Sequence, residues 1–138
     1  MTEETTELIT LPSRIEAIAD AAAAAEEAAR RSGFPEDALF GIDMAVREAV
    51  TNAVLHGNKQ DAGKTVELGF ATSGHDMVIT VRDEGEGFDP STVADPTEEQ
   101  NLLKASGRGI LFMRSFMDDV RWERLPTGGT LVRMTKKK

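Results

Sequence analysis

The sequence contains no cysteine. Disulfide bonds, thiolate metal sites and cysteine nucleophiles are therefore excluded. Its only two histidines, His56 and His75, are too few and too far apart in the chain for a dedicated metal site. There is also no G-x-S-x-G or similar nucleophile motif. Any chemistry has to come from other side chains.

Long hydrophobic runs are also missing. No apolar run reaches the roughly 18 residues that a membrane-spanning helix needs. The acidic N-terminus, MTEETTELITLP, lacks the basic and apolar regions of a signal peptide. We therefore expect a cytoplasmic protein that makes no contact with a membrane.

Basic residues are outnumbered, with 16 Lys and Arg against 24 Asp and Glu, and the net charge is −8 at pH 7. Non-specific nucleic-acid binding relies on Lys and Arg, so we expect no direct nucleic-acid partner. The negative charge fits basic partners, or a site that reaches phosphates through backbone amides and a metal. It fits simple solubility equally well.

The length of 138 residues predicts a single domain, 1–138, with a core of ordinary size. Hydrophobic periodicity predicts its helices and strands. The expected elements are a strand at 7–11, an Ala-rich helix capped by Ser13 and Glu16 and ending at Arg31, a helix from Pro35 to about His56, strands at 65–72 and 77–82, a helix at 109–117, and a hairpin at 120–125 and 130–134. We predict an α+β fold, a two-layer α/β sandwich whose mixed, mainly antiparallel sheet is covered on one face by helices.

The second predicted helix carries an acid and an amide one turn apart. Glu48 and Asn52 lie on one side of this helix, at the margin of the apolar face that contains Ala49 and Ala53. A carboxylate there is partly desolvated, which makes it a better proton acceptor. The amide oxygen can bind a hard cation such as Mg²⁺. An ordinary helix flank would show the same pattern.

Asp83 follows the strand predicted at 77–82. Met77, Ile79 and Val81 share its parity, so the alternation directs its side chain toward the apolar face. A buried carboxylate needs a hydrogen-bond donor. The exocyclic amine of adenine is such a donor, whereas guanine presents a carbonyl oxygen. The alternative is a turn in which the side chain bonds the backbone that follows.

Glycines accompany this acid in two turns. Gly85 and Gly87 follow Asp83 directly and permit either interpretation of its side chain. Gly128, Gly129 and Thr130 are compatible with a nucleotide contact and with a simple hairpin turn.

Two further glycines, Gly107 and Gly109, precede the third helix. Backbone N–H groups at a helix start, unobstructed by side chains, form a natural phosphate site. Arg108 and Lys104 would add charge to the same phosphates. Taken singly, each of these two basic residues fits a solvated lid surface better.

Together these blocks resemble the motifs of the GHKL ATPases, which have the Bergerat fold, and within them the bacterial anti-sigma factors that are serine-protein kinases (RsbW-like). EAVTNAVLHGN at 48–58 is similar to the N box, DEGEGFDP at 83–90 to the first glycine box and GRGILFMRSFMDDV at 107–120 to the second. GGT at 128–130 sits where the last nucleotide-site element is expected. The resemblance covers residues 8 to 135 and implies one histidine kinase-like ATPase domain, with an ATP lid at about 89–106.

The resemblance implies ATP and Mg²⁺ as ligands. It implies that Glu48 is the general base toward the hydroxyl of a protein substrate, that Asn52 ligates Mg²⁺, and that Asp83 binds the adenine amino group. It implies that Gly85, Gly87, Gly107 and Gly109 let the chain close around the nucleotide. Arg108 and Thr130 are further candidates for nucleotide binding.

The partners also follow from the resemblance. It implies an ATP-dependent serine/threonine kinase that phosphorylates a STAS-type anti-sigma factor antagonist and, in its other state, holds a sigma factor inactive, commonly as a homodimer. One alternative is a nucleotide-gated module that holds a regulatory partner without significant kinase activity, which the intact Glu48 disfavours. Another is an ATPase that hydrolyses nucleotide for its own conformational cycle, which the 138 residues disfavour because they leave no room for a transducer domain.

Overall fold

The computed structural model of the chain describes residues 5–58, 61, 63–85, 109–126 and 128–138. In chain order its elements are β1 (Thr5–Pro12), α1 (Ala17–Arg31), α2 (Glu36–Asn52), the short π-helix η1 (Ala53–Gly57), β2 (Thr65–Thr72), β3 (Asp76–Arg82), α4 (Gly109–Phe116), β4 (Asp119–Arg124) and β5 (Thr130–Lys137). The lid expected at about 89–106 lies outside the described residues.

The five strands form one sheet in the order β1-β2-β3-β5-β4. All four pairings are antiparallel. The hairpins β2–β3 and β4–β5 join where β3 pairs with β5, so that Val81 lies opposite Val132. This topology places the end of β3 beside the start of β5 in the middle of the sheet, rather than at an edge.

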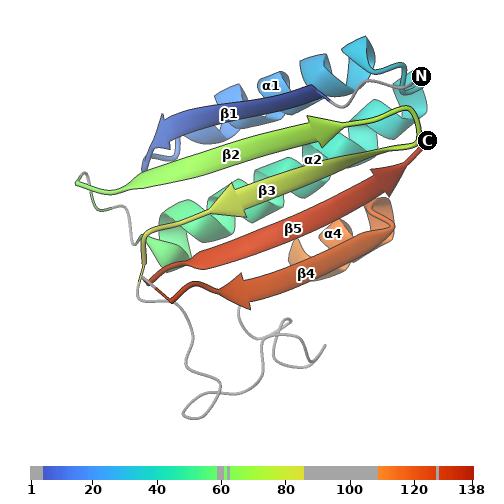
Figure 1. The fold of residues 1–138 in the computed structure, drawn as a ribbon. Helices are drawn as coiled ribbons and strands as arrows, with labels where there is room; N and C mark the ends of the chain where they lie inside the picture. The colour runs from blue at the N-terminus through green and yellow to red at the C-terminus, as the bar shows by residue number, and fades with distance from the viewer. Residues whose placement is uncertain (1–4, 59–60, 62, 86–108, 127) are drawn as a thin grey trace.

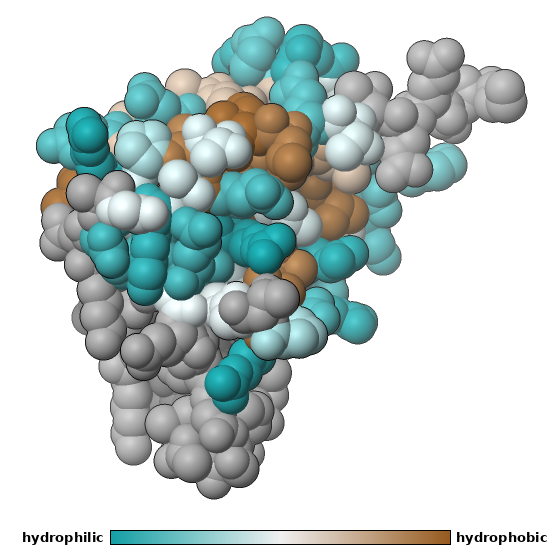
Figure 2. Space-filling view, turned by 60° about the vertical axis from the view of Figure 1, so that its left-hand side comes forward, coloured by the Kyte–Doolittle hydropathy of each residue, from teal (hydrophilic) through white to brown (hydrophobic). Residues whose placement is uncertain are grey.

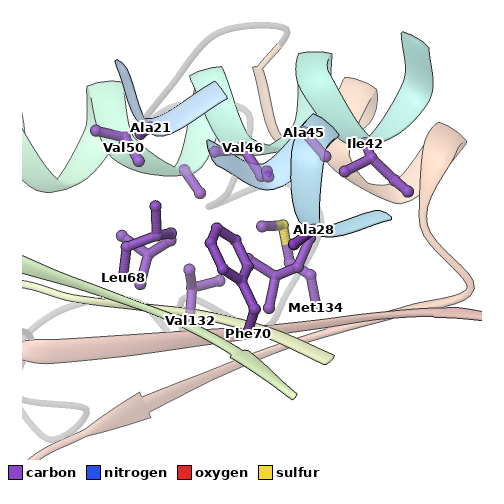
Figure 3. Close-up of a cluster of buried hydrophobic side chains, with 14 of the residues drawn as sticks. Ala21, Ala28, Ile42, Ala45, Val46, Val50, Leu68, Phe70, Val132 and Met134 are labelled. Atoms are coloured by element: carbon purple, nitrogen blue, oxygen red, sulfur yellow. The ribbon is translucent and has the colours of Figure 1, made fainter. Parts of the chain in front are cut away.

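The described helices all lie on one face of the sheet, behind it in Figure 1. The core fills the space between the two layers, as Figure 3 shows. Ile42, Val46 and Val50 reach into it from α2, and Leu68, Phe70 and Met134 reach into it from the strands. Burial of a side chain of this size contributes about 1.5–3 kcal/mol. The predicted α+β two-layer sandwich with helices on one face is confirmed.

Alanine makes up most of the buried face of α1. Ala21, Ala25 and Ala29 are fully buried, and the helix packs against α2. Side chains this small allow two helices to approach closely, and alanine has the highest helix propensity of all residues. The sequence thus favours both the formation of α1 and its position over the sheet.

The capping box predicted before α1 is wrong. Glu16 occupies the N-cap position with helical backbone angles and makes no side-chain cap. Backbone hydrogen bonds from Arg14 N–H to Pro12 O and from Ala17 N–H to Arg14 O turn the chain first. The Ser13 side chain is buried, and its hydroxyl has no hydrogen-bond partner in the described part of the chain. A Ser-x-x-Glu pattern specifies a cap only if the helix begins next to the Ser, whereas here it begins at Ala17.

The opposite face of the sheet carries mostly polar and small side chains. Leu8, which is 65% exposed, is the large hydrophobic residue on this face of β1. In Figure 2, hydrophobic surface gathers in the upper part of the view and is bordered by hydrophilic residues. None of the described helices is long and apolar enough to cross a membrane.

Both ends of the described chain lie at one end of the sheet (Figure 1). Thr5 at the start of β1 pairs with Thr72 at the end of β2. Lys138 donates its backbone N–H to His75 O in the adjacent turn. The end of β3, where Asp83 follows, is therefore at the far end of the strands from Thr5 and Lys138.

Candidate functional site

Helix α2 places Glu48 and Asn52 on one flank, as their spacing predicts. Their neighbours Ala49 and Val50 are buried in the core, whereas Glu48 and Asn52 are half-buried at its margin. Among the described residues, no hydrogen bond engages the side-chain amide of Asn52. The helix therefore presents a carboxylate and an amide, one turn apart, at the boundary between core and solvent.

The helix predicted to end near His56 does extend that far, but its last turn is a π-helix. Asn58 N–H donates to Ala53 O at 2.8 Å, which is the five-residue spacing of a π-turn. Val54 in this turn is fully buried, and Asn58 just after it is only 1% exposed. Such turns occur frequently at functional sites. No sequence pattern indicated this one.

Asp83 is buried directly after β3, as the strand alternation predicts, with 7% of its surface exposed. Its Oδ1 accepts hydrogen bonds from Gly85 N–H at 2.9 Å and from Thr130 N–H at 3.1 Å. Asp83 N–H in turn donates to Thr130 O at 3.0 Å. Within the described part of the chain, Oδ2 accepts no hydrogen bond. The turn interpretation thus accounts for one carboxylate oxygen and leaves the other available to a ligand.

The surroundings of Asp83 raise the pKa of its carboxyl above the ordinary value of 3.8. Burial is the largest cause, because it disfavours the charged form. The N–H groups of Gly85 and Thr130 and the positive charge of Lys64 act in the opposite direction. A ligand that donates a hydrogen bond to this carboxylate would compensate for part of the lost hydration.

The turn before β5 closes against Asp83. Gly128 and Gly129 have φ angles of +96° and +94°, which L side chains rarely adopt. A Cβ atom at Gly129 would overlap the carbonyl oxygen of Asp83 and lie 3.1 Å from its carbonyl carbon. At Gly128, the nearest atom to a Cβ would be Gly85 O, at an ordinary 3.6 Å. Gly129 is therefore the glycine that permits Thr130 to reach the Asp83 carboxylate.

Several of the predicted site residues cannot be placed. Gly87, Gly107, Arg108 and Lys104 lie outside the described residues. Gly109 is the first residue of α4, as expected, and Gly85 is buried beside Asp83. The structure thus brings Asp83, Gly85 and Thr130 together, and carries Glu48 and Asn52 on the helix that packs over β3.

A protein-family model described as the histidine kinase-like ATPase domain matches residues 11–136, nearly the whole chain. The chain belongs to this family. Membership in a family of ATPase domains implies a site for ATP.

Curated relatives of this histidine kinase-like ATPase domain are anti-sigma factors, so the family resemblance noted in the sequence is confirmed. The chain is 37% identical over 102 residues to an anti-sigma F factor of Bacillus velezensis, a match that covers 72% of this chain and 70% of the relative. An anti-sigma F factor of Thermoanaerobacter pseudethanolicus is 39% identical over 100 residues, covering 71% of this chain and 69% of the relative.

Two solved structures share the fold. The RsbU and RsbW domains of Rv1364c from Mycobacterium tuberculosis match with a TM-score of 0.67 at 21% identity, covering 96% of this chain and 31% of that one. A chain of the SiaB–SiaC complex from Pseudomonas aeruginosa matches with a TM-score of 0.69 at 14% identity, covering 94% of this chain and 88% of that one.

The described residues of this ATPase domain fit both expected ligands. Asp83 Oδ2 is an acceptor without a partner in the described structure, which suits the adenine amine. The amide of Asn52 is half-buried and likewise unengaged there, and its oxygen is a hard ligand of the kind that Mg²⁺ prefers. Mg²⁺ usually binds few protein groups and completes its shell with water and phosphate oxygens, which is compatible with a site to which the protein contributes this amide.

Sequence reasoning missed Asn58. It is the last residue of the N-box segment at 48–58, to which the sequence pattern assigns no separate role. In the structure, its side-chain Nδ2 donates to Thr65 O at 2.9 Å, and its Oδ1 accepts from Glu84 N–H at 2.7 Å. The one signal available was its position at the end of an apolar helix. The partners at 65 and 84 are too distant in sequence to be indicated by it.

Proposed function

We propose that this chain is an ATP-dependent serine/threonine protein kinase that acts as an anti-sigma factor. It would phosphorylate a STAS-type anti-sigma factor antagonist on Ser or Thr, and would hold a sigma factor inactive when the antagonist is phosphorylated. The family of ATPase domains and the anti-sigma F factors among the relatives support the binding of ATP and a role in partner switching.

One observation carries the kinase part of this proposal. Glu48 is half-buried on the flank of α2, one turn before Asn52, on the helix that packs over the strand leading to Asp83. A module that only binds nucleotide needs an adenine contact such as Asp83, but it has no need of a carboxylate beside the proposed metal ligand. The presence of all three residues favours transfer of the phosphoryl group.

In the proposed reaction, the hydroxyl oxygen of the substrate Ser or Thr attacks the γ-phosphorus of ATP. The bond between this oxygen and phosphorus forms as the bond from phosphorus to the β–γ bridging oxygen breaks, and ADP leaves. Glu48 accepts the hydroxyl proton, and Asp83 fixes the base end of the nucleotide. Such reactions depend mainly on positioning and on charge stabilisation, with little covalent chemistry from the protein.

Asn52 would hold Mg²⁺ through its amide oxygen. The metal, when bound, neutralises negative charge on the phosphate oxygens. The contribution of the chain is to keep this amide oxygen one helical turn from Glu48, so that the proton acceptor and the metal ligand face the same end of the nucleotide.

The proposal also covers the oligomeric state and the cellular location of the protein. We propose that it works as a homodimer in the cytoplasm, because the resemblance implies a dimer and because sigma factors act there. It binds no nucleic acid itself, in keeping with the net charge of −8. A measurement of molar mass in solution tests the dimer independently of the kinase activity.

The decisive experiment is phosphoryl transfer from labelled ATP, with Mg²⁺, to STAS-domain proteins encoded in the same genome. Glu48→Ala should bind ATP about as tightly as the wild type and should lose transfer, because the general base typically contributes about 10²- to 10⁴-fold. Asp37→Ala is the matched control, since Asp37 is an exposed acid at the other end of α2.

Label on one partner's Ser or Thr, lost in Glu48→Ala and kept in Asp37→Ala, would establish the kinase. Transfer by Glu48→Ala at the wild-type rate would refute the role of Glu48 as base. Tight ATP binding by the wild type without transfer to any partner would favour the nucleotide-gated binding module instead.

A further inference from the structure

Asn58 joins three segments that meet at the site. It follows η1, and its side chain lies between the start of β2 and the residue after Asp83. Nδ2 donates to Thr65 O at 2.9 Å, and Oδ1 accepts from Glu84 N–H at 2.7 Å. We refer to these two hydrogen bonds as the Asn58 bridge.

The Asn58 bridge has a fixed orientation. An amide has a donor and an acceptor at its tip, and here the donor meets a carbonyl oxygen and the acceptor meets an N–H group. Reversal of the amide would bring two donors together at Glu84 and two acceptors together at Thr65. Because Asn58 is 1% exposed, water cannot easily replace either bond.

A second contact reinforces the same junction. The Glu84 carboxylate accepts hydrogen bonds through Oε2 from the backbone N–H and the hydroxyl of Thr65. The backbone of Glu84 is thus held by Asn58, while its side chain is held by Thr65. On the other side, Thr130 holds both the backbone and the carboxylate of Asp83.

We propose that Asn58 is a positioning residue for nucleotide binding, which sets the Asp83–Gly85 turn relative to the helix that carries Glu48 and Asn52. The inference rests on the proposed function in one respect, namely that Asp83 contacts the adenine of ATP. The bridge connects the end of this helix to the residue next to Asp83. It therefore fixes the adenine contact relative to the groups proposed to act at the phosphates.

Asn58→Asp tests this proposal through pH. The isosteric carboxylate can still accept from Glu84 N–H, but when ionised it cannot donate to Thr65 O and repels it. When protonated, its O–H can make that bond. Charged groups near this position among the described residues are Asp61, Lys64, Asp83 and Glu84, and three of these four favour protonation of an acid at position 58.

The measurement is the Kd for ATP by titration calorimetry, for the wild type and Asn58→Asp, across the range from about pH 5.5 to 8. At the alkaline end, Asn58→Asp should bind ATP at least about tenfold more weakly than the wild type, as expected from loss of one buried hydrogen bond. The ratio of the two Kd values should fall toward one on acidification. Taking the ratio removes the titration of ATP itself.

Ile42→Val is the control for a purely structural effect. Ile42 is fully buried in α2, away from the bridge, so this variant should lower the melting temperature and leave the Kd for ATP unchanged. If Asn58→Asp lowers the melting temperature but binds ATP as the wild type does at every pH, the proposal is overturned. A ratio that stays constant with pH would overturn it as well.

A measurement on the wild type avoids any dependence on folding of the variant. The Glu84 amide proton, which the bridge engages, should exchange with solvent at least about tenfold more slowly when ATP is bound, because the ligand stabilises the turn. An unchanged rate, in a protein that binds ATP, would refute the role of Asn58. Absence of ATP binding by the wild type would instead refute the proposed nucleotide site.

Discussion

The turn at Gly128 and Gly129 offers a matched pair of substitutions for testing the role of Asp83. Both glycines have a φ angle near +95°, at +96° and +94°. Alanine at either position therefore incurs the cost of a left-handed backbone, about 1–2 kcal/mol. Only at Gly129 does the new Cβ overlap the Asp83 carbonyl oxygen. The difference in Kd for ATP between the two variants thus reports the effect of displacing Asp83.

The magnitude follows from the contacts of Asp83. Relief of the overlap requires the carbonyl to move by roughly 1 Å, to reach an ordinary non-bonded separation. Such a shift separates the carboxylate from Thr130 N–H and from a ligand amine. A hydrogen bond to a charged group contributes about 1.5–3 kcal/mol, which corresponds to about 10- to 150-fold in Kd.

The assay is ATP binding by titration calorimetry, with the melting temperature measured in parallel. We expect Gly128→Ala to melt below the wild type but to bind ATP with nearly unchanged Kd. Gly129→Ala should lose at least about tenfold in affinity. If both variants bind ATP equally well and both are folded, then the position of Asp83 does not control nucleotide binding and the reasoning fails.

Two predictions concern Asp83→Asn. In this variant Oδ1 can still accept hydrogen bonds from Gly85 and Thr130, but the amide nitrogen would face the ligand as a donor. The preference for ATP over GTP should therefore fall by about 10-fold or more in a displacement assay. An unchanged preference would contradict the adenine contact. The raised pKa of Asp83 means that, between the ordinary pKa of 3.8 and the native pKa, the native state binds more protons than the unfolded state. Wild-type stability therefore falls as the pH rises through this range. Asp83→Asn does not titrate, so the free variant should become increasingly more stable than the wild type above pH 3.8. Melting temperatures of both proteins from about pH 3.5 to 8 check this, and a difference that shrinks with rising pH would show that the sign is wrong.

The part of the site that could be predicted from sequence is the part set by local periodicity. Strand alternation alone predicts that Asp83 is on the buried side. Residues two apart in a strand point to the same face, and Met77, Ile79 and Val81 point to the core. Helical spacing likewise placed Glu48 and Asn52 on one flank. Both statements depend only on residues within a few positions of one another.

The remainder depends on contacts between distant segments. The Asn58 bridge joins residues 58, 65 and 84, and no pattern in the sequence identifies the partners of a buried amide. The π-helical turn at Ala53–Gly57 brings Asn58 to that position, and its residues would fit an α-helix equally well. The capping box at Ser13 failed for a local reason instead, because backbone hydrogen bonds between residues 12 and 17 turn the chain first and delay the start of α1 to Ala17.

The placement of the termini has a practical consequence. Thr5 and Lys138 lie beside the Thr72–Asp76 turn, whereas Asp83 lies beyond the other end of β3. The length of β3 separates them, about 20–25 Å for a strand of this size. An affinity tag, a fluorophore or a surface-immobilisation linker attached at Lys138 would therefore lie at the opposite end of the sheet from the candidate site. Fusion proteins made in this way should report on nucleotide binding without obstructing it.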